Sequence, residues 1–572
     1  MHATKQACQP NVSGTQDFMK TPRAMFEVRD SGQTVRNGGL GIVLRGAALV
    51  FALMAPGTVL AEGAEADDSE FIPATFDYSL PLTLDRHEQY FLAQNFDAAT
   101  HGLGHADATT ADTNPQEPKR LGTKAAGTSE LIPAVEIVGF NLLLNRFNYY
   151  FIDKAVYGST LQSVRDNLSG RWVVDTDPFA VNQFMHPYQG SVYFGLARST
   201  GHDYWESLGY TFGGSLLWEI AGETGAPSIN DLVTTGFGGT FLGEPLFRMA
   251  SLLLEGGGGG GGNAPGVMRE LGAAIISPSL GFTRLAFGNR FRSVFDSRHP
   301  ATYSYMRLGW DKVDNVFDEA MSQKVKRHAV SADFHMSYGL PGKPGYRYTR
   351  PFDYFDFEFT ANTATTFENI MSRGLLVGKE YAVGDDYRGI WGLYGTYDYI
   401  SPQIFRVSST ALSLGTTAQW WLSPSVALQG TALAGLGYGA AGTIHGLGER
   451  DYHYGATPQA LLAFRLMFGK RAVLDMTARS YYVSDVASTE DRGSERIFRG
   501  DAALTVRVRG PHAVTLRYNE SRRNARYPDI ADTQQTVKTL SLLYTYYFGG
   551  DKSGAVEWRE AASLRPLKDS TP

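Results

Sequence analysis

The spacing of apolar residues changes along the chain and divides it into a helical part and a strand part. Between about 131 and 255, apolar residues recur at helical spacing, and some segments are apolar on nearly every side. After residue 300 the period becomes two, so that Val330 and Phe334 share one face of a segment while Ser331 and Asp333 share the other. We therefore predict an α+β chain in which a helical module precedes a sheet domain.

The strand part has the pattern of an antiparallel transmembrane β-barrel. Roughly 12 alternating segments of about 10–14 residues lie between 301 and 549, and each is long enough for a tilted strand to cross a bilayer. One face of these segments is almost purely apolar, and the other carries repeated Arg, Asp and Glu, as a lipid face and a wet lumen require. An arginine added at Thr505 in such a lumen should be tolerated, whereas one at Leu504 on the lipid face should not. A soluble β-sandwich, which also alternates, is the alternative.

Two stretches bear on the barrel prediction. Residues 407–448 contain no Asp, Glu, Lys or Arg and are long enough for two membrane helices. Pro424 divides them, and strand alternation continues around it, which favours one long hairpin. The last predicted strand, 539–548, ends on Phe548 and resembles the C-terminal strand that the barrel assembly machinery recognises, although a polar tail of 550–572 follows it.

The N-terminus has the pattern of an export signal. Arg36 and Arg45 supply positive charge, 46–55 is apolar, and small residues lead to a cleavage site at Ala61. The apolar run is too short for a spanning helix, so we predict a leader of 1–61 with a cleaved signal peptide. An uncleaved anchor is the alternative.

Two segments of unusual composition connect these parts. Residues 62–130 are acidic, rich in Ala and Thr and without sustained periodicity, which predicts a disordered periplasmic linker. His101 and His105 lie four residues apart within it, but the glycines between them favour two solvated histidines over a metal site. The unbroken glycine run of 256–262 predicts a flexible joint, and it opens a bridge of 256–300 into the barrel.

Composition and charge narrow the class of protein. The chain has 572 residues with 52 Lys and Arg against 58 Asp and Glu, so no basic excess exists to neutralise the phosphates of a nucleic acid. Charged residues make up 19% of the chain and aromatic residues 12%, with 64 glycines, which is typical of a barrel that meets lipid. The one cysteine, Cys8, lies in the predicted leader, so the mature chain has no thiol for a disulfide, a metal site or a nucleophile.

The densest polar chemistry lies between 171 and 248, in a series of short blocks. They are NQFMHPY at 182–188, GSVYF at 190–194, ARS at 197–199, WES at 205–207, GSLLWE at 214–219, PSIND at 227–231 and LGE at 242–244. With these blocks, residues of about 130–290 closely resemble the bacterial family catalogued as domain of unknown function 3943. The resemblance implies an exported envelope protein with a helical module. It implies no activity, because the function of that family is itself unassigned.

One predicted helix carries a polar stripe. On 203–223, Ser215, Glu219 and Glu223 recur every four residues in otherwise apolar surroundings. Two glutamates at this spacing repel each other when both are ionised. The arrangement therefore calls for a cation, a metal or a raised pKa on one carboxyl group.

The residues near this stripe in sequence form a candidate site. We predict that His186, Glu219 and Glu223 form a general acid/base set, with no metal and no cofactor. The same atoms could instead form a structural network that joins helices, which is the interpretation we favour. The further members of a ligand-binding or structural network are Asn182, Gln183, Arg198, Ser215, Asn230, Asp231, Glu244 and Arg248.

Two functions of different classes fit these patterns. The first is an outer-membrane β-barrel protein of a Gram-negative bacterium, acting in envelope transport, integrity or assembly, with its helical module on the periplasmic side or inside the barrel as a plug. The second is an outer-membrane enzyme that acts on lipid or lipopolysaccharide through His186 and the two glutamates. An open pocket in which His186 reaches either glutamate would favour the enzyme. The expected partners are outer-membrane lipid and the barrel assembly machinery, and the sequence assigns no oligomeric state.

Overall fold

The computed structural model describes most of the chain from residue 128 to residue 548. The described residues are 128–175, 177–255, 265–288, 291, 294–316, 326–445, 448–486 and 493–548. The predictions that fall outside them are the leader 1–61, the linker 62–130 up to residue 127, His101 and His105, the glycine joint 256–262 and the tail 550–572.

The first described part is a helical module. Its helices are α3 (Leu131–Phe151), α4 (Lys154–Tyr157), α5 (Leu161–Ser169), α6 (His186–Ser199), α7 (Tyr204–Ala221), α8 (Ile229–Val233), α9 (Gly239–Glu255), α10 (Val267–Ile276) and α11 (Pro278–Phe287). Two π-helical turns, η2 (Val181–Met185) and η3 (Thr234–Gly238), lead directly into α6 and α9. Among the described residues, no helix is both long and apolar enough to span a membrane.

Side-chain caps fix where several of these helices begin. The Asp203 side chain accepts a hydrogen bond from the amide of Glu206, whose own side chain accepts one from the amide of Asp203, and α7 starts there. Thr160 and Ser163 form the same reciprocal cap at the start of α5. Each pair satisfies amide groups that a helix terminus leaves without a partner.

The second part is a closed antiparallel barrel of 12 strands, as predicted. The strands are β1 (Thr302–Val316), β2 (His328–Tyr338), β3 (Phe355–Asn362), β4 (Asn369–Val383), β5 (Tyr387–Ile400), β6 (Arg406–Ser423), β7 (Val426–Gly442), β8 (Tyr452–Phe468), β9 (Ala472–Val483), β10 (Ser494–Arg509), β11 (His512–Arg526) and β12 (Thr533–Tyr547). Each strand pairs with its neighbours in sequence, and β1 pairs with β12 to close the ring. The charge-free stretch forms the β6–β7 hairpin, which confirms the prediction of strands there.

The two ends of the barrel differ. At the end where β1 begins and β12 finishes, four connections have only two or three residues, and the fifth is the long β2–β3 loop of 339–354. At the opposite end the connections are longer, for example nine residues between β7 and β8. We call these the terminus end and the loop end.

Alternate residues of each strand face the lumen or the outside. Arg307, Asp333, Arg465 and Asp501 come from different strands and line one internal cavity, which marks the lumen-facing set. Their sequence neighbours face outward and form the outer wall. Much of that wall is exposed and apolar, with side chains such as Leu308, Trp310, Trp391, Leu412, Leu414, Leu436, Leu504, Val506, Leu516 and Leu542.

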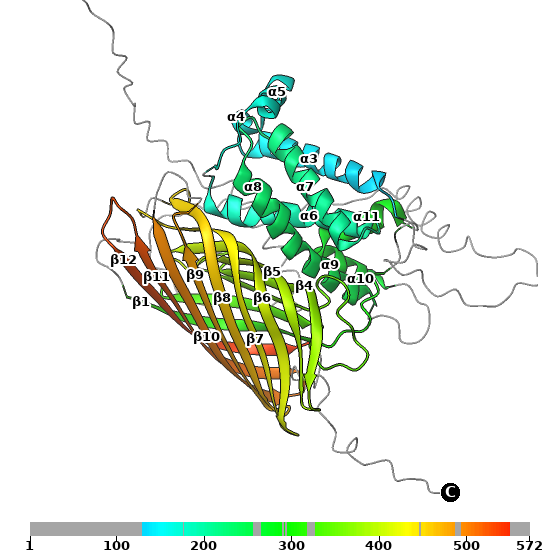
Figure 1. Cartoon of the computed structure of the whole chain (residues 1–572), viewed down its shortest axis with the longest axis vertical. Helices are drawn as coiled ribbons and strands as arrows, with labels where there is room; N and C mark the ends of the chain where they lie inside the picture. Colours follow the sequence, from blue (N-terminus) through cyan, green and yellow to red (C-terminus); the bar gives the residue numbers. More distant parts are fainter. Residues whose placement is uncertain are drawn as a thin grey trace, which may run out of the picture.

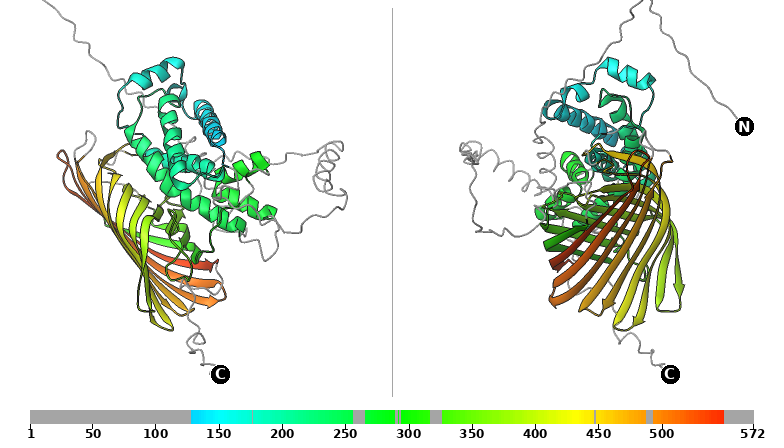
Figure 2. Two further views of the ribbon diagram at one scale, coloured as in Figure 1. Left: turned by 45° about the vertical axis from the view of Figure 1, so that its right-hand side comes forward. Right: turned by 90° about the vertical axis from the view of Figure 1, so that its left-hand side faces the viewer.

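The helical module lies against the outer wall of the barrel, which corrects the expectation of a plug in the lumen. Helix α9 contacts β4 and β5, and η3 contacts β6. Figures 1 and 2 show the helices outside the ring of strands, with α3 farther from the barrel than α9. The physical reason is an aromatic outer wall: the outward-facing rings of Phe355, Phe357 and Tyr397 share one buried cluster with Phe194 and Phe241 of the module.

The lumen is filled rather than wet. Ion pairs cross its middle, including Arg517 with Asp333 at 2.5 Å and Arg465 with Asp475 at 2.7 Å. A cavity of about 90 Å³ remains among them. Thr505, where we expected an arginine to be tolerated, is almost fully buried and accepts a hydrogen bond from Arg307 at 3.2 Å. That expectation is wrong because the space is already occupied.

Apolar clusters close the lumen at each end. At the terminus end, Tyr303, Leu340 of the β2–β3 loop and Trp421 belong to one buried cluster. At the loop end, Ile404 and Phe405 of the β5–β6 connection belong to another. Side chains and loops of the chain itself thus occupy the lumen along its length.

Candidate functional site

The polar residues predicted from the sequence divide into two groups, both within or beside the module. One group, which we call the arginine network, contains Arg198, Glu244, Arg248 and the barrel residue Asp353. The other, which we call the acidic cluster, contains His186, Glu219, Glu223, Asp175, Asp177 and Asp231.

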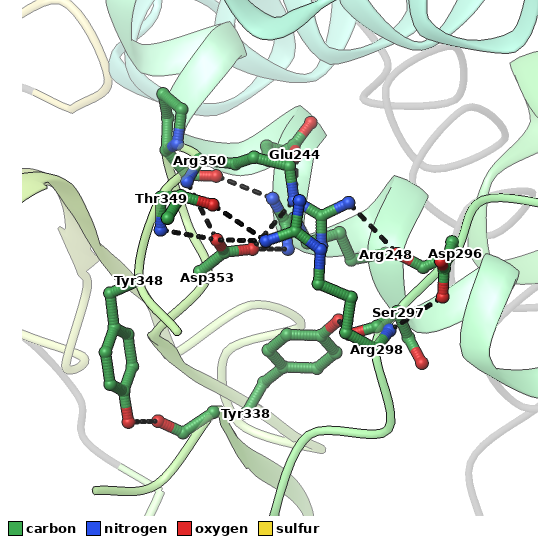
Figure 3. A network of polar contacts seen from close by, with 12 residues as sticks. Glu244, Arg248, Asp296, Ser297, Arg298, Tyr338, Tyr348, Thr349, Arg350 and Asp353 are labelled. Carbon is green, nitrogen blue, oxygen red and sulfur yellow. Dashed lines mark hydrogen bonds and ion pairs between the residues drawn. The ribbon is translucent and has the colours of Figure 1, made fainter. Parts of the chain in front are cut away.

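The arginine network connects two helices of the module to the barrel (Figure 3). Arg198 of α6 donates from Nε to Glu244 of α9 at 2.7 Å, and Arg248, one turn further along α9, donates to the same carboxylate at 2.7 Å. Arg248 also donates to Asp353 in the β2–β3 loop at 3.0 Å and to the carbonyl of Pro351 at 2.6 Å. Two guanidinium groups therefore share two buried carboxylates.

These charges are fully enclosed and mutually paired. Glu244 and Asp353 have no exposed surface, and Arg248 is 1% exposed. Burial alone would disfavour the ionised form of Asp353, but the guanidiniums of Arg248 and Arg350 hold the pKa of this carboxyl below its usual range. A buried charge that loses its partner is costly, so the network fixes the module on the barrel and has no free group for chemistry.

A second polar contact joins the module to strand β8. Asn182 of η2 and Asn230 of α8 donate to the Tyr454 hydroxyl at 3.2 and 2.8 Å, and Gln183 donates to it at 3.0 Å. Both asparagines also donate to Asp175. The three predicted amides therefore serve the junction between module and barrel.

His186 and Glu219 lie in the acidic cluster without a hydrogen bond to each other. Nδ1 of His186 is 3.3 Å from the Thr235 hydroxyl, and its Nε2 is 3.9 Å from a carboxylate oxygen of Asp231. Glu219 accepts from the amide of Ser228 at 2.8 Å. His186 and Glu219 are each 6% exposed.

Burial raises the pKa of four carboxyl groups of the acidic cluster, those of Asp177, Glu219, Glu223 and Asp231. Burial, followed by the nearby charge of Asp231, raises the pKa of Glu219 to about 8, although His186 opposes this shift. Burial likewise raises the pKa of Glu223, which accepts a hydrogen bond from the Trp218 indole at 3.0 Å. Of the three possibilities that the sequence left open, a cation, a metal or a raised pKa on one carboxyl group, the structure favours a raised pKa, and it does so for both glutamates, with burial as the larger cause.

Arg198 and Arg248, which we predicted to be members of the same network, do not pair with the glutamate stripe. Arg198 and Arg248 are both bonded to Glu244, so Glu219 has no guanidinium beside it. Ser215 is buried one turn before Glu219, and its hydroxyl has no hydrogen-bond partner among the described residues. Over the same residues, no three His, Cys, Asp or Glu side chains converge as metal ligands would.

Sequence reasoning missed Asp175, Asp353 and Tyr454. Asp353 lies more than a hundred residues from Arg248, and no local pattern links the two. Asp175 and Tyr454 meet the predicted asparagines through tertiary contacts alone. The Tyr-His-Tyr alternation at 452–454 was a visible signal of an outward aromatic pair, but not of its partner.

The geometry supports a structural role for His186 and the two glutamates better than a catalytic role. Among the described residues, His186 makes no hydrogen bond or ion pair with either glutamate, two of the three groups are almost fully buried, and none of the three lines the lumen cavity, the smaller cavity beside Arg373 or the open groove beside Glu206 and Tyr210. This arrangement can share and hold protons, but it presents no room for a substrate beside His186.

Comparisons with known proteins agree with this architecture. Residues 171–279 match the family model described as domain of unknown function DUF3943, which confirms the resemblance over narrower bounds than about 130–290. The chain thus combines a match to that family in its helical module with a closed 12-strand barrel. No curated protein matches the sequence.

Several solved outer-membrane channels show weak structural similarity. The outer membrane channel DcaP of Acinetobacter baumannii is 6% identical, with 43% of this chain and 96% of that chain covered and a TM-score of 0.20. A mutant of the TodX monoaromatic hydrocarbon channel is 10% identical, covers 44% and 91%, and has a TM-score of 0.19. A mutant of the porin of Rh. blastica is 8% identical, covers 43% and 99%, and has a TM-score of 0.15. At such scores, the strand pairing of this chain remains the evidence for its barrel.

Proposed function

We propose that this protein is an integral outer-membrane β-barrel of a Gram-negative bacterium that carries a helical module on its outer wall and acts in envelope integrity rather than as an open channel. The observation that carries the proposal is the outer wall itself. Trp310 is 71% exposed and Leu414 64% exposed, on opposite sides of a closed ring whose lumen holds many of the strand charges, while outward charges such as those of Glu520 and Arg522 lie in the half of β11 nearer the loop end. An apolar wall of this kind would be unfavourable in water and is what a bilayer requires.

The connections support one orientation of the barrel. In outer-membrane barrels the turns on the periplasmic side are short and the extracellular loops are longer. The terminus end therefore faces the periplasm, and strand β12 presents its aromatic C-terminal end there, where the barrel assembly machinery would bind it.

The contacts of the module with the outer wall support a position for the module relative to the membrane. It contacts Asp353 near the terminus end and Glu449 at the loop end, where the amide of Phe179 donates to the Glu449 carbonyl at 2.8 Å. A module that extends between the two ends of the wall lies beside the barrel at the level of the bilayer. We therefore propose this location in place of the periplasmic side.

The filled lumen argues for integrity over transport. Water-filled porins have 16 to 18 strands, whereas small barrels fill their interior with side chains. Here buried clusters close each end and ion pairs occupy the middle. The protein would contribute its outer surface to the membrane, and no solute path through the lumen is needed.

Fractionation, electrophoresis and conductance together examine this proposal. The mature chain should be recovered in the outer-membrane fraction and should migrate faster in unheated than in heated detergent gels. In planar bilayers it should give no stable open-channel current. Recovery in the soluble periplasm would refute the membrane proposal, and a steady conductance from the purified protein would refute the closed lumen.

The second candidate is an enzyme that acts on lipid or lipopolysaccharide, and one observation favours it. Glu219, with its pKa raised to about 8, would be protonated at neutral pH, as a general acid must be. A Glu219→Gln protein that assembles normally but has the envelope phenotype of a deletion strain would favour this candidate. A Glu219→Gln protein with a wild-type envelope would remove it.

A further inference from the structure

A groove on the far side of the module is open and largely apolar. It lies between α3 and α7, has a volume of about 500 Å³, and is within the range of ligand sites. Its lining residues are Glu130, Ala134, Ile137, Val138, His202, Glu206, Gly209, Tyr210, Gly213, Gly214 and Leu217. Along α7 it extends for about 16 Å, at 1.5 Å per residue from Glu206 to Leu217.

Two glycines form the floor of this groove without a local reason. A Cβ atom built on Gly209 or Gly213 would have no atom within 4 Å. Glycine inside a helix costs about 0.5–1 kcal/mol relative to alanine. Neither residue has a positive φ that would require glycine. What these two glycines provide is therefore the open space above the helix backbone.

Helix α3, which forms the other side, has an apolar surface that no described residue covers. Leu131 is 72% exposed and Leu143 73% exposed, and Val135, Val138, Leu142 and Phe147 are exposed as well. A helix that is apolar on nearly every side is stable when other apolar matter surrounds it. Among the described residues, α4, α6 and α7 pack against α3, and Thr283 of α11 donates to its Glu136 at 3.0 Å, yet the apolar side chains named above stay exposed.

The groove is continuous with the outer wall of the barrel. Leu412 and Leu414 are exposed on β6, which contacts η3. Phe237 of η3 is 39% exposed, and its ring lies 4.9 Å from that of Phe212, which precedes Gly213 on α7. Apolar side chains on β6, η3 and α7 therefore lie between the barrel wall and the groove, and Phe237 and Phe212 are in contact there.

The opposite end of the groove is acidic. Glu130 and Glu206 lie there, and His202 contacts Glu206 at 3.0 Å. The Glu206 side chain is 58% exposed, so its carboxylate can meet a cation in solvent or at a membrane surface. An acidic rim of this kind attracts an ammonium group and repels a phosphate that has no positive charge beside it.

We propose that this groove binds one acyl chain of a phospholipid whose headgroup carries an ammonium, with that headgroup beside Glu130 and Glu206. The inference rests on the proposed location of the module at the level of the bilayer. The apolar floor receives the chain, the path along Phe212 and Phe237 admits it from the lipid around the barrel, and the two glutamates select the headgroup.

The experiment uses the full mature chain in vesicles of either phosphatidylethanolamine or phosphatidylglycerol, followed by transfer to mild detergent and native mass spectrometry. Wild-type protein should retain one phosphatidylethanolamine and at least tenfold less phosphatidylglycerol. Gly213→Leu fills the floor without a clash and should reduce retention at least tenfold. Gly139→Leu is the matched control, because Gly139 on α3 also has open space around it but lies outside the groove lining, and it should bind like the wild type.

Each other outcome overturns a defined part of the proposal. Equal retention of both lipids, or an unchanged preference in Glu130→Gln, would refute selection by the acidic rim. Retention that Gly213→Leu does not alter would refute the groove. A dimer that Gly213→Leu abolishes, or lipid binding that appears only after deletion of 62–127, would assign the groove to a second copy or to that segment instead. If the protein fractionates with the outer membrane but retains no lipid, only this inference fails; if it is not in the membrane, the proposed function fails.

Discussion

At the scale of single residues, the acidic cluster is distinguished by carboxyl groups that keep their protons. Glu219 is enclosed by helices, has Asp231 nearby and receives one amide hydrogen bond from Ser228. Its pKa of about 8 compares with an ordinary value near 4.5. When a carboxyl pKa is higher in the folded state, the unfolded chain loses this proton at a lower pH than the folded chain does. Raising the pH therefore makes folding less favourable.

The pH dependence of Glu219→Gln should reveal this proton. Between pH 4.5 and about 8 the folded state retains a proton that the unfolded chain has lost, so wild-type stability should fall as pH rises through this window. With about 1.4 kcal/mol for each pKa difference of one, the difference between 4.5 and about 8 corresponds to a fall on the order of 4–5 kcal/mol. Glu219→Gln should show a smaller fall and should exceed the wild type at pH 8 in thermal unfolding monitored in detergent. Glu130→Gln, an exposed glutamate, is the control that should behave like the wild type; an equal pH slope in Glu219→Gln would contradict the assignment.

At the scale of elements, the arginine network decides how α6, α9 and the β2–β3 loop are held together. Glu244 carries both guanidinium contacts within the module, and Asp353 extends them to the barrel (Figure 3). The stability of a buried ion pair depends on both partners. If one is removed, the charge that remains is enclosed and cannot be solvated by water.

Replacing Glu244 should therefore separate the module from the barrel wall. Glu244→Gln leaves Arg198 and Arg248 with one negative charge fewer, at an expected cost of about 3–5 kcal/mol. The measurement is the melting temperature of the full mature chain, with limited proteolysis of the module as a second readout. Asp532→Asn removes the partner of Arg526 at a pair in which both side chains are exposed and should cost no more than about 1 kcal/mol. Equal effects of the two substitutions would show that the network does not hold the module in place.

At the scale of the whole molecule, the barrel has two surfaces of opposite character, an apolar outer wall and a charged lumen. The outer wall is apolar where the module leaves it uncovered, as a lipid face would be, and the lumen is packed with paired charges. Neighbouring residues on one strand should therefore respond to the same substitution for different reasons.

Arginine at Leu504 and at Thr505 should reduce folding at both positions. Leu504→Arg places a charge on the lipid face and should cost roughly 2–4 kcal/mol near the midplane. Thr505→Arg overfills a buried site beside Arg307 and Thr515, at a cost of about 1–3 kcal/mol before repulsion between the two arginines. Thr505→Ser keeps the hydroxyl and should fold normally. The measurement for each variant is the yield of the heat-modifiable band. A second substitution, Arg307→Gln, in the Thr505→Arg protein should restore folding only if the lumen is filled as described.

The sequence by itself determined the local architecture of this protein. A period of two fixes which strand residues share a face, and a strand number of about 12 and the β6–β7 hairpin follow from it because alternation and turn residues act over short distances, whereas closure of the ring depends on the pairing of β1 with β12. The family blocks identified most of the polar residues that the module uses, among them Asn182, Arg198 and Glu244.

Only the tertiary structure decided where the module sits and which charges meet. An outward-facing Phe357 looks the same in a sequence whether lipid or a helix covers it, so alternation could not distinguish a plugged lumen from a covered wall. Likewise, Glu219 lies near Arg198 in sequence, yet Glu244 takes that arginine because α6 and α9 pack face to face. Ion pairing depends on distances of a few ångströms in three dimensions, and residue spacing along the chain does not fix those distances once several helices pack together.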